Sequence, residues 1–187
     1  MNGGETFLHE MARTVAVAVA AGMMIAGCSG SPAAPTRDEA PGSFLKFTST
    51  PGDWVGQGES RHYTAADARF RAVMDLDRHH LEVTVRTPDF VEDWTLNAAA
   101  PAGEQLVRRT YERAIAWPSS WFPTRPGFAF EGSGRGCGRL DARFVIRNIQ
   151  YGSLGEVNSL DLIFTQTCED SSSPLTGELR IVDGGSR

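Results

Sequence analysis

The feature that most constrains the fold of this chain is the alternation of apolar and polar residues that begins at Ser43. A period of two residues places apolar side chains on one face of an extended strand and polar side chains on the other. Turn residues such as Pro51-Gly52-Asp53 interrupt the pattern at short intervals. The alternation therefore predicts a domain of short β-strands, each of which buries one face.

We expect an all-β fold with about eight short strands, arranged as a single β-sandwich or jelly-roll-like domain. Only residues 103–116 have a composition that permits a helix, and Thr110 and Tyr111 weaken that expectation. The expected strands are residues 45–47, 70–76, 81–86, 94–97, 128–130, 143–149, 159–167 and 177–182.

The clearest strand pair is formed by residues 143–149 and 159–167. Apolar residues occupy every second position in both segments, and the glycine-framed sequence Gly152-Ser153-Leu154-Gly155 lies between them. A short turn between two alternating segments is typical of a hairpin. The sequence therefore predicts that these two strands are antiparallel neighbours.

The chain contains three cysteines, an odd number that leaves at least one without a partner in the chain. If Cys28, at the end of the apolar amino-terminal run, is not available for pairing, Cys137 and Cys168 remain to form one disulfide. These two residues flank the predicted hairpin, so the bond would join the outer ends of its strands. The alternative is a pair of free buried cysteines. Two cysteines without a nearby histidine are too few for a structural zinc site.

The first 27 residues are expected to be a signal peptide. An apolar run of twelve residues, 15–26, precedes Cys28 and is too short to remain as a membrane span. Glu5 and Glu10 are unusual in such a leader, and a start at Met11 would supply a more typical basic beginning. The alternative is a buried alanine- and valine-rich helix in a cytosolic protein.

Residues Ile25-Ala26-Gly27-Cys28 resemble the bacterial lipoprotein signal, in which an aliphatic residue and two small residues precede an invariant cysteine. The resemblance implies that the sulfur of Cys28 carries a diacylglyceryl group and that Cys28 becomes the new amino terminus. Several acyl chains, at about 0.8 kcal/mol per buried CH₂, would make a stable anchor. We therefore expect the protein to be extracytoplasmic and anchored to the bacterial cell membrane.

Residues 28–42 are expected to form a lipidated, flexible tether. They are small, polar and interrupted by proline, and they offer no apolar face to bury. Residues 43–187 would then form the folded domain. About 160 residues remain after removal of the signal, which is enough for one domain with a hydrophobic core.

Three further motifs resemble a bacterial extracellular β-sandwich module. They are residues 51–58, the Gly-Arg-Gly-Cys sequence at 134–137 and the Gln-x-Cys-Glu sequence at 166–169. The resemblance covers about residues 44–182 and implies a secreted fold with a Cys137–Cys168 bond, but no activity. The chain departs from the family pattern at Gly138, where asparagine is usual, and at Thr167, where histidine is usual.

The composition and the glycine pattern argue against nucleotide-linked functions. The net charge of −5 gives no electrostatic footprint for nucleic acid. A phosphate-binding loop needs a helix directly after its glycines, whereas a strand is predicted after the glycine cluster at 132–138. We expect a tight turn there, with Arg135 locking it through backbone carbonyls or a carboxylate such as Glu169.

The sequence marks no catalytic residue, no metal ligand set and no cofactor site. His79-His80 lies in a predicted turn without an indicated third ligand. Asp89, Glu92 and Asp93 lack the ordered spacing of a calcium loop and are expected to be solvated. There is no Gly-x-Ser-x-Gly sequence, and no pair of carboxylates is distinguished from the others.

The most suggestive binding feature is the aromatic segment that contains Trp117, Trp121 and Phe122 within a proline-framed loop. If these side chains are exposed, they would form an apolar platform for a glycan, a lipid or a protein partner. The alternative is that Trp117 and Trp121 cover one end of the core.

From these observations we expect a monomeric, non-enzymatic binding or interaction module of the cell envelope. One alternative is a hydrolase that acts on envelope polymers, which would show a deep cleft with two facing carboxylates. The other is a purely structural module without a ligand site.

Replacing Cys28 with alanine is expected to release the protein from the cell membrane, because the lipid can be attached only through the cysteine sulfur. Cell fractionation and metabolic labelling with a fatty acid measure release and acylation. The control variant Ser31→Ala, in the same tether, should remain anchored and labelled. Retention of the Cys28→Ala protein in the membrane fraction would contradict the predicted anchor.

Overall fold

The computed structural model describes residues 42–118, 124–169 and 171–182, all of which belong to the compact unit Ala40–Arg187. These residues contain ten β-strands and no helix, so this part of the chain is all-β, as predicted. Accordingly, none of the described segments is a helix able to cross a membrane. The strands are β1 (Phe44–Ser49), β2 (Ser60–Thr64), β3 (Arg69–Met74), β4 (His80–Arg86), β5 (Asp93–Ala99), β6 (Thr110–Ala116), β7 (Gly127–Gly132), β8 (Leu140–Tyr151), β9 (Val157–Cys168) and β10 (Leu175–Val182).

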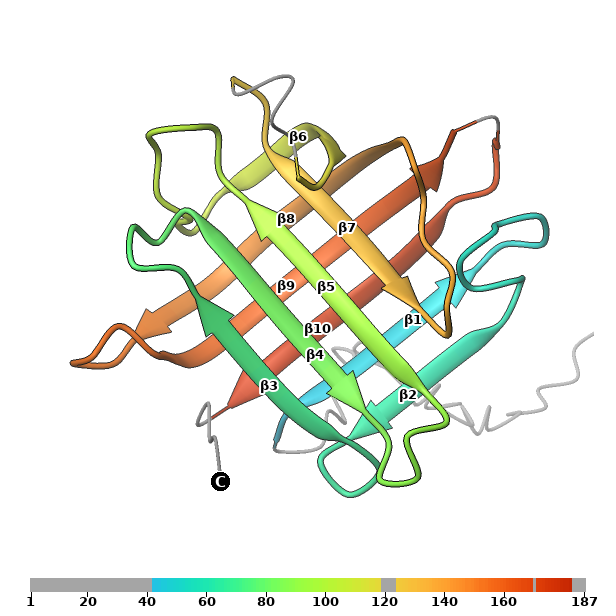
Figure 1. The fold of residues 1–187 in the computed structure, drawn as a ribbon, viewed down its shortest axis with the longest axis horizontal. Coiled ribbons are helices and arrows are strands. Elements are labelled where there is room, and N and C mark those ends of the chain that lie inside the picture. Colours follow the sequence, from blue (N-terminus) through green and yellow to red (C-terminus); the bar gives the residue numbers. More distant parts are fainter. Residues whose placement is uncertain (1–41, 119–123, 170, 183–187) are drawn as a thin grey trace, which may run out of the picture. The chain divides into compact units, whose positions relative to one another are not determined.

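The ten strands form one mixed sheet in the order β2-β1-β10-β9-β8-β6-β7-β5-β4-β3. Neighbouring strands are antiparallel except for β6 and β7, which run parallel over a short stretch. The sheet curls, so that β3, β4, β5 and β7 cross in front of β8, β9, β10 and β1 in Figure 1. Strands β2 and β3 remain as the two edges of the sheet.

Aromatic side chains fill the space between the two halves of the curled sheet. Phe47 of β1 packs against Trp94 of β5 and Phe130 of β7, with ring centroids 4.6 and 5.2 Å apart. Phe164 of β9 contacts Phe128 and Phe130 at 5.2 and 4.9 Å. All five rings are buried. Large aromatic side chains bury much apolar area each, so these contacts hold the curl.

Two glycines make room for these rings. A Cβ atom at Gly177 would lie 2.3 Å from Cζ of Phe164, and one at Gly132 would lie 2.3 Å from Cε3 of Trp94. Any larger residue would therefore displace a core ring. Gly132 was expected in a tight turn but ends strand β7, whereas Gly134, with φ +75°, lies in the turn itself.

The predicted hairpin and disulfide are both confirmed. Strands β8 and β9 are antiparallel, with Phe144 opposite Phe164. Cys137, just before β8, is bonded to Cys168 at the end of β9, and their Cα atoms are 5.2 Å apart. Closing a loop with a sequence separation of 31 residues restricts the unfolded chain. In the chain-entropy treatment this contributes about 3–4 kcal/mol of stability.

The expected strand number was wrong, because β2 and β6 were not predicted. Strand β2 is a short edge strand in which only Tyr63 is buried, so it lacks the alternating pattern. Strand β6 lies within residues 103–116, which were considered as a possible helix. Its pairing with β8 contains an irregularity between Tyr111 and Ala114, and Arg113 has a φ of 54°. Contacts in the folded sheet override its local helix propensity.

A buried glutamine connects the two halves of the sheet. Strand β7 pairs with β6 only at Gly127 and Phe128, so the backbone of Phe130 lacks a strand neighbour on that side. Gln166 of β9 takes this place: the Phe130 N–H donates to Gln166 Oε1, and Gln166 Nε2 donates to the Phe130 carbonyl, both at 2.9 Å. The Gln166 side chain is fully buried. Its amide thus acts as a substitute for a missing strand.

Replacing Gln166 with methionine is expected to lower the free energy of unfolding by about 2–5 kcal/mol, because the buried N–H and C=O of Phe130 would each lose their partner. Urea unfolding of both proteins measures the difference. Gln150→Met, on the exposed face of β8, is the matched control and should change stability little. Equal effects of the two substitutions would show that the Gln166 amide does not connect the sheet.

Candidate functional site

Of the three aromatic residues predicted to form a binding surface, the structure describes only Trp117. Trp117 follows β6 and is half-buried, with its indole ring stacked on the imidazole of His80 at a centroid distance of 4.2 Å. The Nε2 atom of His80 lies 2.8 Å from Oδ1 of Asn97. One face of Trp117 is therefore covered by the domain itself. Trp121 and Phe122 lie outside the described residues, as does Cys28.

The three motifs of the extracellular-module resemblance meet at one structural junction. Arg135 donates from Nε to the carbonyl of Val55 at 3.0 Å and so fastens loop 51–58 to the turn before the disulfide. Glu169 accepts from the Arg139 N–H at 2.7 Å. The expected role of Arg135 through a backbone carbonyl is confirmed, and its acceptor is Val55 rather than Glu169. Because these contacts are all within the protein, they give the three motifs a structural role.

The acidic cluster is also used within the protein. Asp89 accepts from the Thr87 hydroxyl, and Asp93 forms an ion pair with Arg86 at 2.6 Å. Glu92 accepts a hydrogen bond from Tyr63. In residues 42–118, 124–169 and 171–182, no group of three or more His, Cys, Asp or Glu side chains is placed to hold a metal ion.

Tyr63 is a buried titratable group at the centre of a small network. Its hydroxyl donates to Glu92 and accepts from Trp94 Nε1 at 3.0 Å. Burial, together with the hydrogen bond to the Glu92 carboxylate, raises the pKa of Tyr63 to about 12. The network joins the edge strand β2 to β5 across the core. It therefore ties the edge strand β2 to the core.

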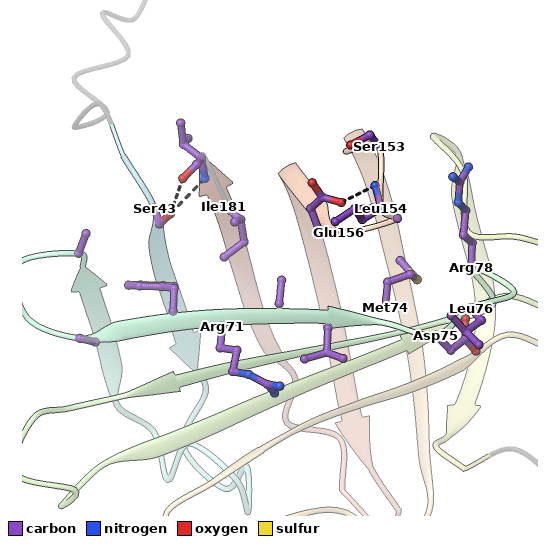
Figure 2. A pocket seen from close by; sticks show the side chains of 17 residues that line it. Ser43, Arg71, Met74, Asp75, Leu76, Arg78, Ser153, Leu154, Glu156 and Ile181 are labelled. Carbon is purple, nitrogen blue, oxygen red and sulfur yellow. Dashed lines mark hydrogen bonds between the residues drawn. The ribbon is translucent and has the colours of Figure 1, made fainter. Parts of the chain in front are cut away.

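The opposite edge of the sheet is open and forms a groove of about 810 Å³ along β3. A volume of this size is typical of ligand pockets. The groove is lined by β3, by the turn 153–156 between β8 and β9, and by the ends of β1 and β10. Figure 2 shows Ser43, Ile181 and Glu156 projecting past the β3 ribbon.

The floor of the groove is apolar. Phe70, Ala72 and Met74 lie on the inner face of β3 and pack against the core, but each is only half-buried. On the neighbouring strand β4, Leu81 and Val83 are completely buried. The cover of the core therefore ends at β3, because no further strand of the described sheet lies beside it.

Exposed apolar side chains surround the groove. Leu76 and Leu154 are almost fully exposed, at 102 % and 93 %, and Val182 is 42 % exposed. These are three of the seven large apolar side chains that the described residues expose. Exposed apolar groups that gather around a concavity, rather than being scattered, indicate an interaction site.

The acidic groups of the groove hold its two turns. Asp75 accepts from the His79 N–H at 2.7 Å, and Glu156 accepts from the Leu154 N–H at 2.9 Å. Both carboxylates thus serve the backbone of their own turn. The arrangement offers binding chemistry, through apolar contact and hydrogen bonds, rather than a pair of groups set for proton transfer.

Sequence reasoning missed this groove. The alternation in residues 70–76 correctly predicts a strand, yet the pattern does not reveal that the strand is an edge. The available signal was Leu154, an exposed apolar residue in a predicted turn, together with Leu76 at the end of the predicted strand 70–76.

Comparison with known proteins identifies no function for this groove. No protein-family model matches the chain, and no curated protein or solved structure matches it either.

Replacing Tyr63 with phenylalanine is expected to flatten the loss of stability at high pH. Because the folded-state pKa, about 12, lies above the ordinary value of 10.0, folding favours the neutral phenol. Its contribution is complete below pH 10 and disappears as the pH rises through 12. Free energies of unfolding across this interval measure the effect. Parallel curves for the two proteins would contradict the role of Tyr63.

Proposed function

We propose that this protein is a non-enzymatic binding protein of the bacterial cell envelope. In this proposal lipidated Cys28 anchors it to the extracytoplasmic face of the membrane, and residues 28–42 tether the domain. The observation that most supports a binding function is the groove along β3, with an apolar floor and three exposed apolar side chains at its rim. We further propose that the curled sheet is a variant of the β-sandwich, since the inner faces of its two halves pack on each other.

A protein partner suits the groove better than a lipid or a glycan. A lipid tail favours an enclosed apolar cavity, whereas this groove is open and carries Arg78, Asp75 and Glu156 among its lining residues. Glycans stack on flat aromatic faces, and the groove contains Phe70 as its one aromatic lining residue among those described. Mixed apolar and charged surfaces of this kind are typical of protein interfaces.

The position of the chain ends fits a tethered binding domain. Ser43, where the chain enters β1, and Val182, where it leaves β10, both line the groove. The Val182 N–H donates to the Ser43 hydroxyl at 3.1 Å, which fixes the two ends of the domain beside each other. A ligand in the groove would therefore lie next to the segment that leads to the tether.

The hydrolase alternative has little support. Asp75 and Glu156 are the carboxylates of the groove, and each is bound to the backbone of its own turn. A retaining or inverting mechanism needs two carboxyl groups that face a common substrate position. The described residues offer no such pair at this groove.

A photo-crosslinking residue placed at Leu154 in the full chain, in living cells, is expected to give a specific adduct, because this side chain stands at the rim of the groove. The same residue at Phe90, which is 72 % exposed and outside the groove, is the matched control. The substitution Leu76→Asp on the opposite rim should abolish the Leu154 adduct. Identical adducts at both positions, or an adduct that survives Leu76→Asp, would exclude the groove as the binding site.

A further inference from the structure

We propose that the groove binds an extended peptide segment of another protein, which adds to the sheet as a new strand beside β3. This inference rests on the proposed binding function and names the chemistry of its partner. The peptide would carry apolar side chains toward the groove floor and acidic side chains on the opposite, solvent-facing side.

The first argument is the free backbone edge of β3. In the described sheet β3 is the last strand and pairs only with β4. The Asp75 N–H donates to the His80 carbonyl at 3.0 Å, so Asp75 and His80 are a hydrogen-bonded pair of this antiparallel ladder. Because bonded and non-bonded positions alternate, the backbone groups of Phe70, Ala72 and Met74 point away from β4. An extended peptide presents donors and acceptors with the same repeat.

The second argument is the uncovered apolar floor. In a strand added beside β3, every second side chain would point inward and lie over the floor formed by Phe70, Ala72 and Met74. Leu154 stands at the rim of the same groove, where it could contact these side chains from the turn. Strand addition would thus bury apolar surface that the domain alone leaves half-exposed.

The third argument is charge. Arg69 and Arg71 lie on the exposed face of β3, and within the described part of the chain neither forms an ion pair. Directly opposed residues of adjacent strands interact, favourably for opposite charges and unfavourably for like charges. An added strand with acidic residues on this face would therefore complement both arginines.

The chain's own ends do not fit this role. Residues 28–42 and 183–187 consist largely of glycine, serine, proline, alanine and charged residues, without alternating large apolar side chains to cover the floor. Neither segment supplies the pattern that the groove requires.

A second copy is disfavoured by the projecting strand ends. Two copies of β3 paired antiparallel are related by an axis perpendicular to the joined sheet. In one copy, Ser43, Ile181 and Glu156 project past the edge of β3 (Figure 2). In the pair, the projecting ends of both copies would lie on the same side of the joined sheet and reach toward the same space. A single extended peptide strand has no such projecting ends and therefore avoids this crowding.

The test uses fluorescent peptides and the full-length protein in detergent micelles. The probe acetyl-Thr-Val-Glu-Val-Glu-Val-Thr-amide is compared with a lysine version and with a version in which the valine nitrogens, whose N–H groups would face β3, are methylated. We expect the glutamate peptide to bind about tenfold more tightly than the lysine peptide, because two opposed charge pairs change sign. Methylation should weaken binding at least as much, since it removes hydrogen-bond donors. Equal binding of the three peptides would overturn strand addition.

Variants of β3 test the same edge from the protein side. Ala72→Pro removes an N–H that faces the groove and leaves the bonds to β4, a position where an edge strand tolerates proline. It should abolish peptide binding while the near-ultraviolet circular dichroism spectrum stays native. The double variant Arg69→Glu, Arg71→Glu, which changes only exposed side chains, should prefer the lysine peptide. An unchanged peptide preference in the double variant would overturn the proposal even if the proline variant fails to fold.

Two further outcomes separate this inference from the function on which it rests. A Leu154 adduct that depends on Leu76, together with no peptide binding, would overturn strand addition and leave the groove as a site for another ligand. If neither the Leu154 adduct nor peptide binding is observed, the proposed binding function is overturned as well. If sedimentation analysis finds a dimer that the Ala72→Pro substitution dissociates, a second copy occupies the edge of β3. This result too would overturn the proposal.

Discussion

The fold depends on the amide of Gln166, which reaches across the core and binds the backbone of Phe130. At this point strand β7 has lost its neighbour β6, so the sheet would otherwise be interrupted between its two halves. The disulfide Cys137–Cys168 lies beside the same contact, and Gln166 Nε2 is 3.4 Å from Cys137 Sγ. A buried amide that satisfies both a donor and an acceptor is costly to replace. The conspicuous motifs around residues 132–139 and 166–169 are thereby explained as structural elements.

The binding edge arises because the sheet curls without closing. Its two edge strands, β2 and β3, differ in how well they cover the core. On the β2 side, the Tyr63 hydroxyl donates to Glu92 and accepts from Trp94 Nε1, which ties the edge strand to the core. On the β3 side, Phe70 and Met74 stay half-exposed and no comparable network forms among the described residues. The two edges therefore differ in how well the apolar inner face is covered: Tyr63 is buried on the β2 side, whereas Phe70 and Met74 are half-exposed on the β3 side.

The sequence predicted those parts of the fold that are encoded locally. The hairpin of β8 and β9 follows from strict alternation around a glycine-framed turn, and the disulfide follows from the count and position of Cys137 and Cys168. Strand β6 was not predicted because its glutamate, arginine and alanines favour a helix, and pairing with β8 decides otherwise. The groove could not be predicted, because a strand becomes an edge only through the order of all ten strands in the described sheet.

Arg69 and Arg71 have a second consequence, which concerns solubility. A strand with one unpaired backbone edge and an apolar inner face is a template for aggregation, and charged side chains on such a strand are a common protection against it. If the protein is held at a membrane, its copies meet at a high effective concentration, and an unprotected edge would be most hazardous there. The two arginines repel the same edge of a neighbouring molecule while they leave the backbone accessible. One pair of side chains can therefore keep the protein dispersed and select the charge of whatever it binds.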